Sequence, residues 1–150
     1  FTYEFSKECL DNPSKRKLER QWQSVIQKVR DILVVCPECG EEIFVNDDTN
    51  PQCMCCGKSF KVSGSLKIND RNILLTPKTK VYLDLDNTPD IQVISTPADI
   101  FPIQLRNTTT NSWSVETPSG KLKSVDPNST MPLKAGLKIN INSTMKGELI

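Results

Sequence analysis

The chain has 150 residues, a net charge of +1 and no histidine, and 25% of its residues are charged. This length accommodates one ordinary domain, or a small module beside a second one. The lack of histidine excludes histidine acid–base catalysis, histidine-containing catalytic dyads and triads, C₂H₂ zinc fingers and H-E-x-x-H metal sites.

Residues 1–35 are expected to be helical and amphipathic. Asn12 and Pro13 match a helix start, with asparagine as the N-cap and proline at the first helical position. Beyond them, apolar residues recur at spacings of three and four, namely Leu18, Trp22, Val25, Ile26, Val29 and Leu33. No ladder of ion pairs supports the polar face, so this helix must be held by packing. Apolar residues that precede it also require a covering surface: Phe1, Tyr3, Phe5 and Leu10.

Four cysteines form two C-x-x-C pairs separated by thirteen residues: Cys36 and Cys39, then Cys53 and Cys56. A glycine follows each pair and permits the left-handed backbone on which a metal-binding knuckle folds. Two such knuckles supply four soft ligands at tetrahedral geometry, which suits a structural Zn²⁺ ion. We therefore predict a zinc ribbon over residues 36–62. A redox site is the alternative, but redox motifs use a single pair.

Two further cysteines are not expected to bind the metal. Cys55 is a spare thiol inside the second pair; it could replace Cys56, but the spacing Cys53-x-Cys55 is less usual. Cys9 is expected to be a buried structural thiol, because no base is available to activate it. Residues 36–70 carry three Lys/Arg against six Asp/Glu, which argues against a phosphate-binding track along the ribbon.

From residue 63 onward, short apolar or alternating segments are separated by turn signals. Strands are expected over 65–68, 73–75, 80–83, 91–94, 103–106, 113–116, 122–125, 137–141 and 148–150. Turns at a spacing of about 8–12 residues favour an antiparallel β-sandwich over residues 63–150. The expected fold class is thus α+β but mostly β: a helix, a zinc ribbon and a C-terminal sandwich.

The order of motifs resembles a known family. Residues 8–16, Glu-Cys-Leu-Asp-Asn-Pro-Ser-Lys-Arg, resemble the run that closes the C-terminal lobe of eukaryotic-like Ser/Thr protein kinases. The rest of the sequence is similar to the tail of a bacterial group of these kinases. The similar residues are 19–31, the first cysteine pair with Gly40, 72–82, 105–107, Trp113, Gly120, 125–127, 137–139 and 147–150. The resemblance implies a zinc ribbon and a forkhead-associated-like sandwich after the kinase lobe. It also gives Arg16 the place of the arginine that pairs with the glutamate ending the activation segment.

The resemblance implies a regulatory role without catalysis in this chain. The Gly-rich loop, the strand lysine, H-R-D and D-F-G are all missing from it. In working forkhead-associated domains, an arginine that follows an early glycine and a Ser…His pair fix the phosphate and the loops. This chain has no Gly-Arg dipeptide and no histidine. The residues nearest the family's binding loop are Arg106, Asn107, Thr108, Thr109, Asn111 and Ser112. Among these, Arg106 is the one cation that could assist phosphate binding.

Three functions remain open at this point. The first is a non-catalytic C-terminal regulatory and protein-interaction region of a bacterial Ser/Thr kinase, with its own kinase domain as partner. The second is a phosphopeptide-binding module of the same fold. The third is a nucleic-acid-binding zinc ribbon, against which the acidic ribbon argues.

The cellular setting is also an expectation from sequence. No secretion signal or membrane-spanning run occurs, and paired reduced cysteines favour the cytoplasm. Because the chain starts with Phe1, we expect it to be part of a longer protein. We expect protein partners, neither nucleic acid nor a membrane, and leave the oligomeric state open.

Overall fold

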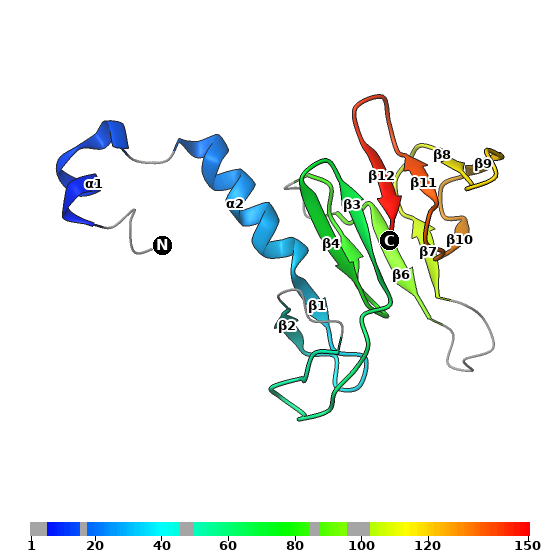
Figure 1. Ribbon diagram of the computed structural model, residues 1–150, viewed down its shortest axis with the longest axis horizontal. Coiled ribbons are helices and arrows are strands. Elements are labelled where there is room, and N and C mark those ends of the chain that lie inside the picture. Colours follow the sequence, from blue (N-terminus) through cyan, green and yellow to red (C-terminus); the bar gives the residue numbers. More distant parts are fainter. Residues whose placement is uncertain (1–5, 16–17, 46–49, 85–87, 96–102) are drawn as a thin grey trace.

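The protein is described from a computed structural model over residues 6–15, 18–45, 50–84, 88–95 and 103–150 (Figure 1). The predictions made for Phe1, Tyr3, Phe5 and Arg16, and for the Cys9 side chain, lie outside the described residues. The described part is mostly β, with one long helix, antiparallel sheets and a four-cysteine cluster, which confirms the coarse fold class. None of its helices is long and apolar enough to cross a membrane.

The N-terminal segment is broken into three helical pieces: α1 (Lys7–Asp11), a 3₁₀ turn η1 (Pro13–Lys15) and α2 (Glu19–Asp31). The predicted helix start at Asn12 and Pro13 is therefore wrong for the long helix. The Asn12 side-chain oxygen accepts a hydrogen bond from the Ser14 hydroxyl at 2.7 Å instead of capping α2. Leu18 is extended, and its N–H donates to the Gln21 side chain at 2.7 Å, so α2 begins after Leu18.

The predicted continuation of the helix to Leu33 is also wrong. β1 (Leu33–Val35) pairs antiparallel with β2 (Glu42–Phe44), with Val34 opposite Ile43. Branched side chains such as Val34 and Val35 suit a strand better than a helix end. The boundary expected between residues 35 and 36 therefore falls inside a hairpin.

Ten strands of the described chain form two antiparallel sheets (Figure 1). Their orders are β10-β7-β6-β5 and β4-β3-β12-β11-β8-β9. The strands are β3 (Gly64–Ile68), β4 (Arg71–Leu75), β5 (Lys80–Val81), β6 (Ile91–Ile94), β7 (Gln104–Asn107), β8 (Trp113–Glu116), β9 (Leu122–Val125), β10 (Thr130–Pro132), β11 (Lys138–Asn140) and β12 (Lys146–Leu149). Every strand predicted after residue 63 is found. The sequence analysis misses β10, a three-residue edge strand that ends on a proline.

The two sheets share one hydrophobic core, to which both contribute alternate residues along their strands. Trp113 of β8 and Leu105 of β7 lie at its centre, 1% and 0% exposed. A second, smaller core lies in the cysteine region and takes in Leu74 of β4. β4 is thus buried on both faces, because its neighbours Ile73 and Leu75 point into the shared core. The Thr76 hydroxyl adds a hydrogen bond to the Val35 carbonyl at 2.9 Å.

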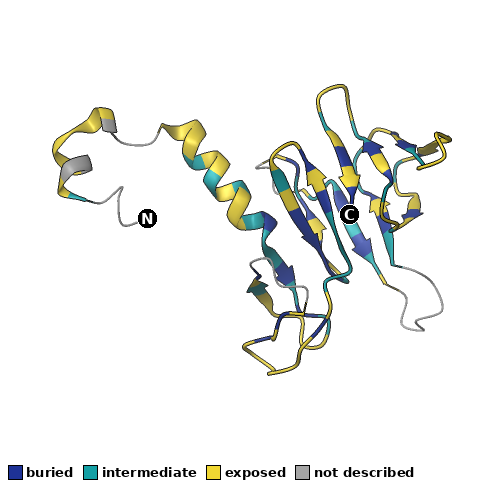
Figure 2. Cartoon of the chain, in the orientation of Figure 1, coloured by how far each residue is buried: buried dark blue, intermediate teal, exposed yellow. Residues whose placement is uncertain are grey.

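Helix α2 projects away from the sheets and is covered only at its C-terminal end (Figures 1 and 2). Asp31 is its one buried residue. Half of the apolar stripe expected to pack in a core is open: Leu18 is 57%, Ile26 52% and Val29 44% exposed. Its other members, Trp22, Val25 and Leu33, are half-buried.

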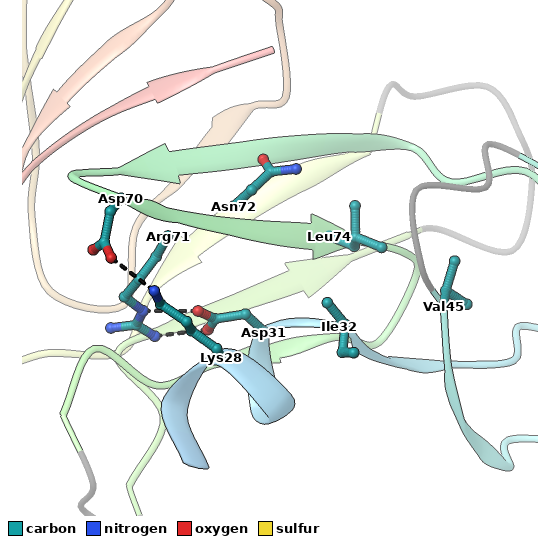
Figure 3. A pocket seen from close by; sticks show the side chains of 8 residues that line it. All are labelled: Lys28, Asp31, Ile32, Val45, Asp70, Arg71, Asn72 and Leu74. Atoms are coloured by element: carbon teal, nitrogen blue, oxygen red, sulfur yellow. Dashed lines mark hydrogen bonds and ion pairs between the residues drawn. The ribbon is translucent and has the colours of Figure 1, made fainter. Parts of the chain in front are cut away.

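The C-terminal end of α2 is fixed to β4 by a buried ion pair (Figure 3). Arg71 donates to both carboxylate oxygens of Asp31, at 2.7 and 2.8 Å, and the two side chains are 12% and 5% exposed. The same guanidinium donates to the carbonyls of Tyr82 and Leu83. Its pKa is raised, first by the hydrogen bond to Asp31. This arrangement ties the end of α2, β4 and the segment that follows β5 to one point.

Candidate metal centre

Two equivalent backbone knuckles present the cysteines. In the first, the N–H of Cys36 donates to the Glu41 carbonyl at 2.8 Å, and the N–H of Gly40 donates to the Cys36 carbonyl at 2.9 Å. In the second, the same two bonds recur from Cys53 to Lys58 and from Gly57 to Cys53, at 2.9 and 2.8 Å. The glycines adopt φ values of +79° and +72°, a conformation that other residues rarely take. The C-x-x-C-G pattern therefore folds as predicted, twice.

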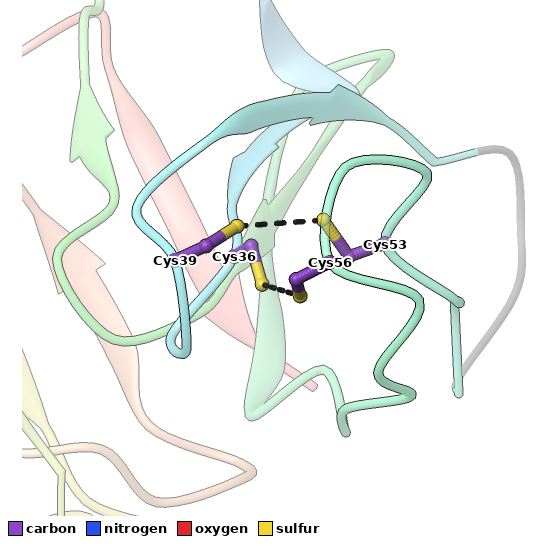
Figure 4. A group of neighbouring side chains, drawn as sticks. All are labelled: Cys36, Cys39, Cys53 and Cys56. Carbon is purple, nitrogen blue, oxygen red and sulfur yellow. Dashed lines mark hydrogen bonds between the residues drawn. The ribbon is translucent and has the colours of Figure 1, made fainter.

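The knuckles bring the four predicted sulfurs together (Figure 4). The Sγ atoms of Cys36, Cys39, Cys53 and Cys56 all lie within 4.8 Å of one another. Cys36 and Cys56 are 3.9 Å apart and Cys39 and Cys53 are 3.6 Å apart, as free thiols without a disulfide. A tetrahedral ion with bonds of about 2.3 Å to sulfur requires separations of about 3.8 Å. The cluster therefore has the dimensions to hold one metal ion.

Electrostatics in the cluster favour ionisation of one sulfur, that of Cys53. The pKa of Cys53 is lowered to about 7, chiefly because the backbone N–H of Cys56, with that of Cys55, points at its sulfur. At Cys39 the N–H of Glu41 lowers the pKa, but burial and the adjacent sulfur of Cys53 raise it further, to about 12. Cys53 thus ionises before Cys39. Binding of a cation would stabilise all four thiolates and release the remaining protons.

The four-cysteine cluster rests on its own core and on one surface ion pair. Cys36 and Cys53 are fully buried beside Val34, Val45 and Phe60. Between the knuckles, the Lys58 ammonium donates to the Glu38 carboxylate at 2.6 Å, which lowers the pKa of Glu38 and raises that of Lys58. Because both groups are exposed, this pair orients the knuckles more than it stabilises them.

Cys55 lies outside the four-sulfur cluster and is exposed. Its neighbour Met54 is 96% exposed, so the tip of the second knuckle points into solvent. The preference for Cys56 over Cys55 as a ligand is consistent with this geometry.

The six candidate binding residues of the 106–112 segment do not form one site. Asn107 is fully buried: its Nδ2 donates to the carbonyls of Asn111 and Val125, and its Oδ1 accepts from the N–H and hydroxyl of Thr109. Thr108 donates its hydroxyl to the Pro89 carbonyl at 2.6 Å, and Ser112 donates to Asp126 at 2.8 Å. These polar groups hold the loop together.

The cavity nearest this loop has the wrong charge for a phosphate. It is lined by Thr108, Thr109 and Asn111, but also by the carboxylates of Asp84 and Asp90. Arg106, the expected cation, is exposed on β7 and does not line it. Ligand binding by the 106–112 segment stays a prediction, without a cation in this cavity to assist a phosphate.

Asn107 is expected to be a structural residue. Asn107→Ala removes the side-chain donor to the buried Val125 carbonyl and the acceptor of two Thr109 hydrogen bonds, and should lower the free energy of unfolding by about 2–3 kcal/mol. Ser112→Ala, which removes one exposed hydrogen bond in the same loop, should change it by less than about 0.5 kcal/mol. Urea unfolding followed by circular dichroism measures both. Equal, small effects would contradict the structural role of Asn107.

Comparison of the chain with protein-family models, with curated proteins and with solved structures finds no match. The function is therefore argued below from the residues and their geometry.

Sequence reasoning misses the polar contacts that join the parts of the molecule. Arg71 and Asp31 are 40 positions apart in the sequence, and Thr76 and Val35 are 41 apart. No local sequence pattern pairs residues at such distances. The charges of Arg71 and Asp31 are visible in the sequence, but their burial becomes visible only once α2 lies against β4.

Proposed function

We propose that this chain is the non-catalytic C-terminal regulatory and protein-interaction region of a bacterial Ser/Thr protein kinase. In this proposal a structural Zn²⁺ ion organises a ribbon over residues 36–62. The two sheets form a forkhead-associated-like sandwich over residues 63–150. The partner is the protein's own kinase domain, and the setting is the cytoplasm, where free thiols persist.

The observation that carries the proposal is the uncovered stripe of α2. A helix with an apolar face needs a packing partner, because short helices in water are held by packing and not by propensity. Leu18, Ile26 and Val29 are 57%, 52% and 44% exposed and lie just after the segment that resembles the end of a kinase lobe. A lobe placed before α2 would cover this stripe and the exposed Leu10.

Zinc is favoured for the metal centre by the ligand set. Four thiolates are soft ligands, and the sulfur separations of 3.6 and 3.9 Å bracket the value of about 3.8 Å for a tetrahedral Zn–S₄ site. Cys36, Cys39, Cys53 and Cys56 would fill the coordination shell, which leaves no position for water or substrate. When bound, the ion cross-links the two knuckles and offsets the negative charge of the thiolates. Its role in this proposal is structural and not catalytic.

The alternatives are less well supported by the site. The loop cavity lined by Asp84 and Asp90 would repel a phosphopeptide that bound as in forkhead-associated domains. Nucleic-acid binding requires clustered Lys/Arg, whereas residues 36–70 hold twice as many acidic as basic residues. That function predicts salt-dependent retention on DNA or RNA, and we expect none at physiological salt.

The proposal is tested on the native product of the source cell. Its mass and peptide map are expected to show a protein several hundred residues longer, with Gly-rich and H-R-D peptides before Phe1. In that product, amide hydrogens of α2 should exchange more slowly than in this chain alone, because the lobe covers the helix. The exposed Leu122 on β9, at the far end of the six-stranded sheet, provides the unchanged control. A native product of this length would refute the kinase assignment.

A further inference from the structure

A second cavity lies where α2, the first strand pair and β5 meet. It has a volume of about 400 Å³. Its lining combines three cations with three apolar side chains: Arg30, Lys78, Lys80, Leu33, Val35 and Tyr82. No lining residue is shared with the cavity beside the 106–112 segment. None of the three cations is among the binding residues predicted from the sequence.

Three cations line the same cavity, Arg30 half-buried and Lys78 and Lys80 exposed, and none is ion-paired with a described carboxylate. Arg30 lies over the Tyr82 ring, 4.4 Å from its centroid, and donates to the Asp84 carbonyl at 3.3 Å, which fixes the guanidinium in place. Lys78 and Lys80 form no ion pair with any residue that the structure describes. Glu42 also lines the cavity, but it makes no ion pair with them either. By contrast, Lys28 and Lys58 are each paired with an acid, Asp70 and Glu38. The cavity therefore keeps an excess of positive charge.

The backbone at Lys78 indicates that this charge is not incidental. The Thr76–Thr79 turn is closed by a hydrogen bond from the Thr79 N–H to the Thr76 carbonyl at 3.0 Å. Pro77 occupies its second position and Lys78 its third, with a φ of +73°. This is the pattern of a type II turn, whose third position favours glycine. The other described non-glycine residues with positive φ are Asn69 and Asn128, and asparagine tolerates that conformation. Lysine here occupies a left-handed backbone position that glycine would take without strain, and it adds a positive charge to the cavity.

We propose that this cavity binds the phosphoryl group of a phosphorylated protein side chain, with Arg30, Lys78 and Lys80 as the cations that hold it. A guanidinium and two ammonium groups match the charge and hydrogen-bonding capacity of a phosphoryl dianion. Leu33, Val35 and Tyr82 offer apolar contact to the chain that carries the phosphate. A nucleic acid would need a longer track of cations, and the adjoining ribbon is acidic. This inference does not depend on the kinase assignment.

The test is an NMR titration of the zinc-loaded chain. The probes are N-acetyl-phosphothreonine methylamide, its unphosphorylated counterpart, inorganic phosphate and a single-stranded RNA oligonucleotide. The phosphorylated compound is expected to shift the amide signals of residues 78–80 and 30 saturably, and the threonine compound is not. Lys78→Gly and Lys80→Gln should each weaken binding about tenfold, because each removes a charge-assisted contact.

Stability separates the loss of a ligand contact from a loss of folding. The melting temperature of Lys78→Gly should be unchanged or higher, because glycine relieves the left-handed backbone. Asn128→Gly, at a similar φ of +64° in another turn, and Lys138→Gln, on β11, should bind like the wild type. Wild-type affinity of Lys78→Gly and Lys80→Gln would overturn the proposal. So would equal binding of the threonine compound, of phosphate alone or of RNA.

Discussion

Replacing Cys39 with serine is expected to abolish stoichiometric metal binding and to expose residues 36–60 to proteolysis. The sulfur of Cys39 is one of four within 4.8 Å of one another, and serine cannot replace a thiolate as a soft ligand. Structural zinc sites supply apparent binding energies of about 10–16 kcal/mol, which in so short a segment is the energy of folding. Metal content is measured by elemental analysis, and the protease-sensitive sites are mapped by mass spectrometry.

Cys55→Ser is the matched control for this experiment. Cys55 belongs to the second knuckle but lies outside the cluster and is exposed, so this variant should keep its metal and its protease resistance. Metal retained in full by Cys39→Ser, or lost by Cys55→Ser, would refute the ligand assignment. The larger core between the sheets contains no residue of the cysteine region. It should therefore survive chelation, with Trp113 still shielded from solvent.

The second large effect is expected at the junction of α2 and β4. Asp31→Asn leaves the Arg71 guanidinium, 12% exposed, without its charged partner and should lower the free energy of unfolding by about 3–5 kcal/mol. Asp70→Asn removes the neighbouring ion pair with Lys28, whose side chains are 55% and 73% exposed. This control should cost less than about 1 kcal/mol. Urea unfolding monitored by circular dichroism measures both variants, and similar costs would show that burial of the Asp31 pair has no energetic role.

The parts of the fold that follow from local pattern could be predicted, and those that depend on distant contacts could not. The C-x-x-C-G spacing determines the knuckles, because the turn, the glycine and the direction of both sulfurs are local properties. Alternation locates the strands of the two sheets for the same reason. The sequence signal for a helix also extends over Leu33, yet tertiary pairing with Phe44 places this residue in a strand.

The 106–112 segment shows the same limit in the candidate site. Its row of polar residues is compatible with a binding loop or with a loop that satisfies its own hydrogen bonds. Only the burial of Asn107 and its four hydrogen bonds distinguish the two. The cations of the second cavity, in turn, come from α2, from the turn before β5 and from β5 itself, segments that sequence alone does not bring together.

Because β4 is buried on both faces, metal binding is linked to the tendency of the protein to aggregate. β4 terminates the six-stranded sheet, and its Leu74 side chain is covered by the cysteine region. If that region unfolds when the metal is lost, this edge strand exposes Leu74 on one face, while Ile73 and Leu75 remain on the face toward the core. Such an edge is a template for intermolecular strand pairing. The metal ion would then protect the protein against aggregation at a strand that it does not touch.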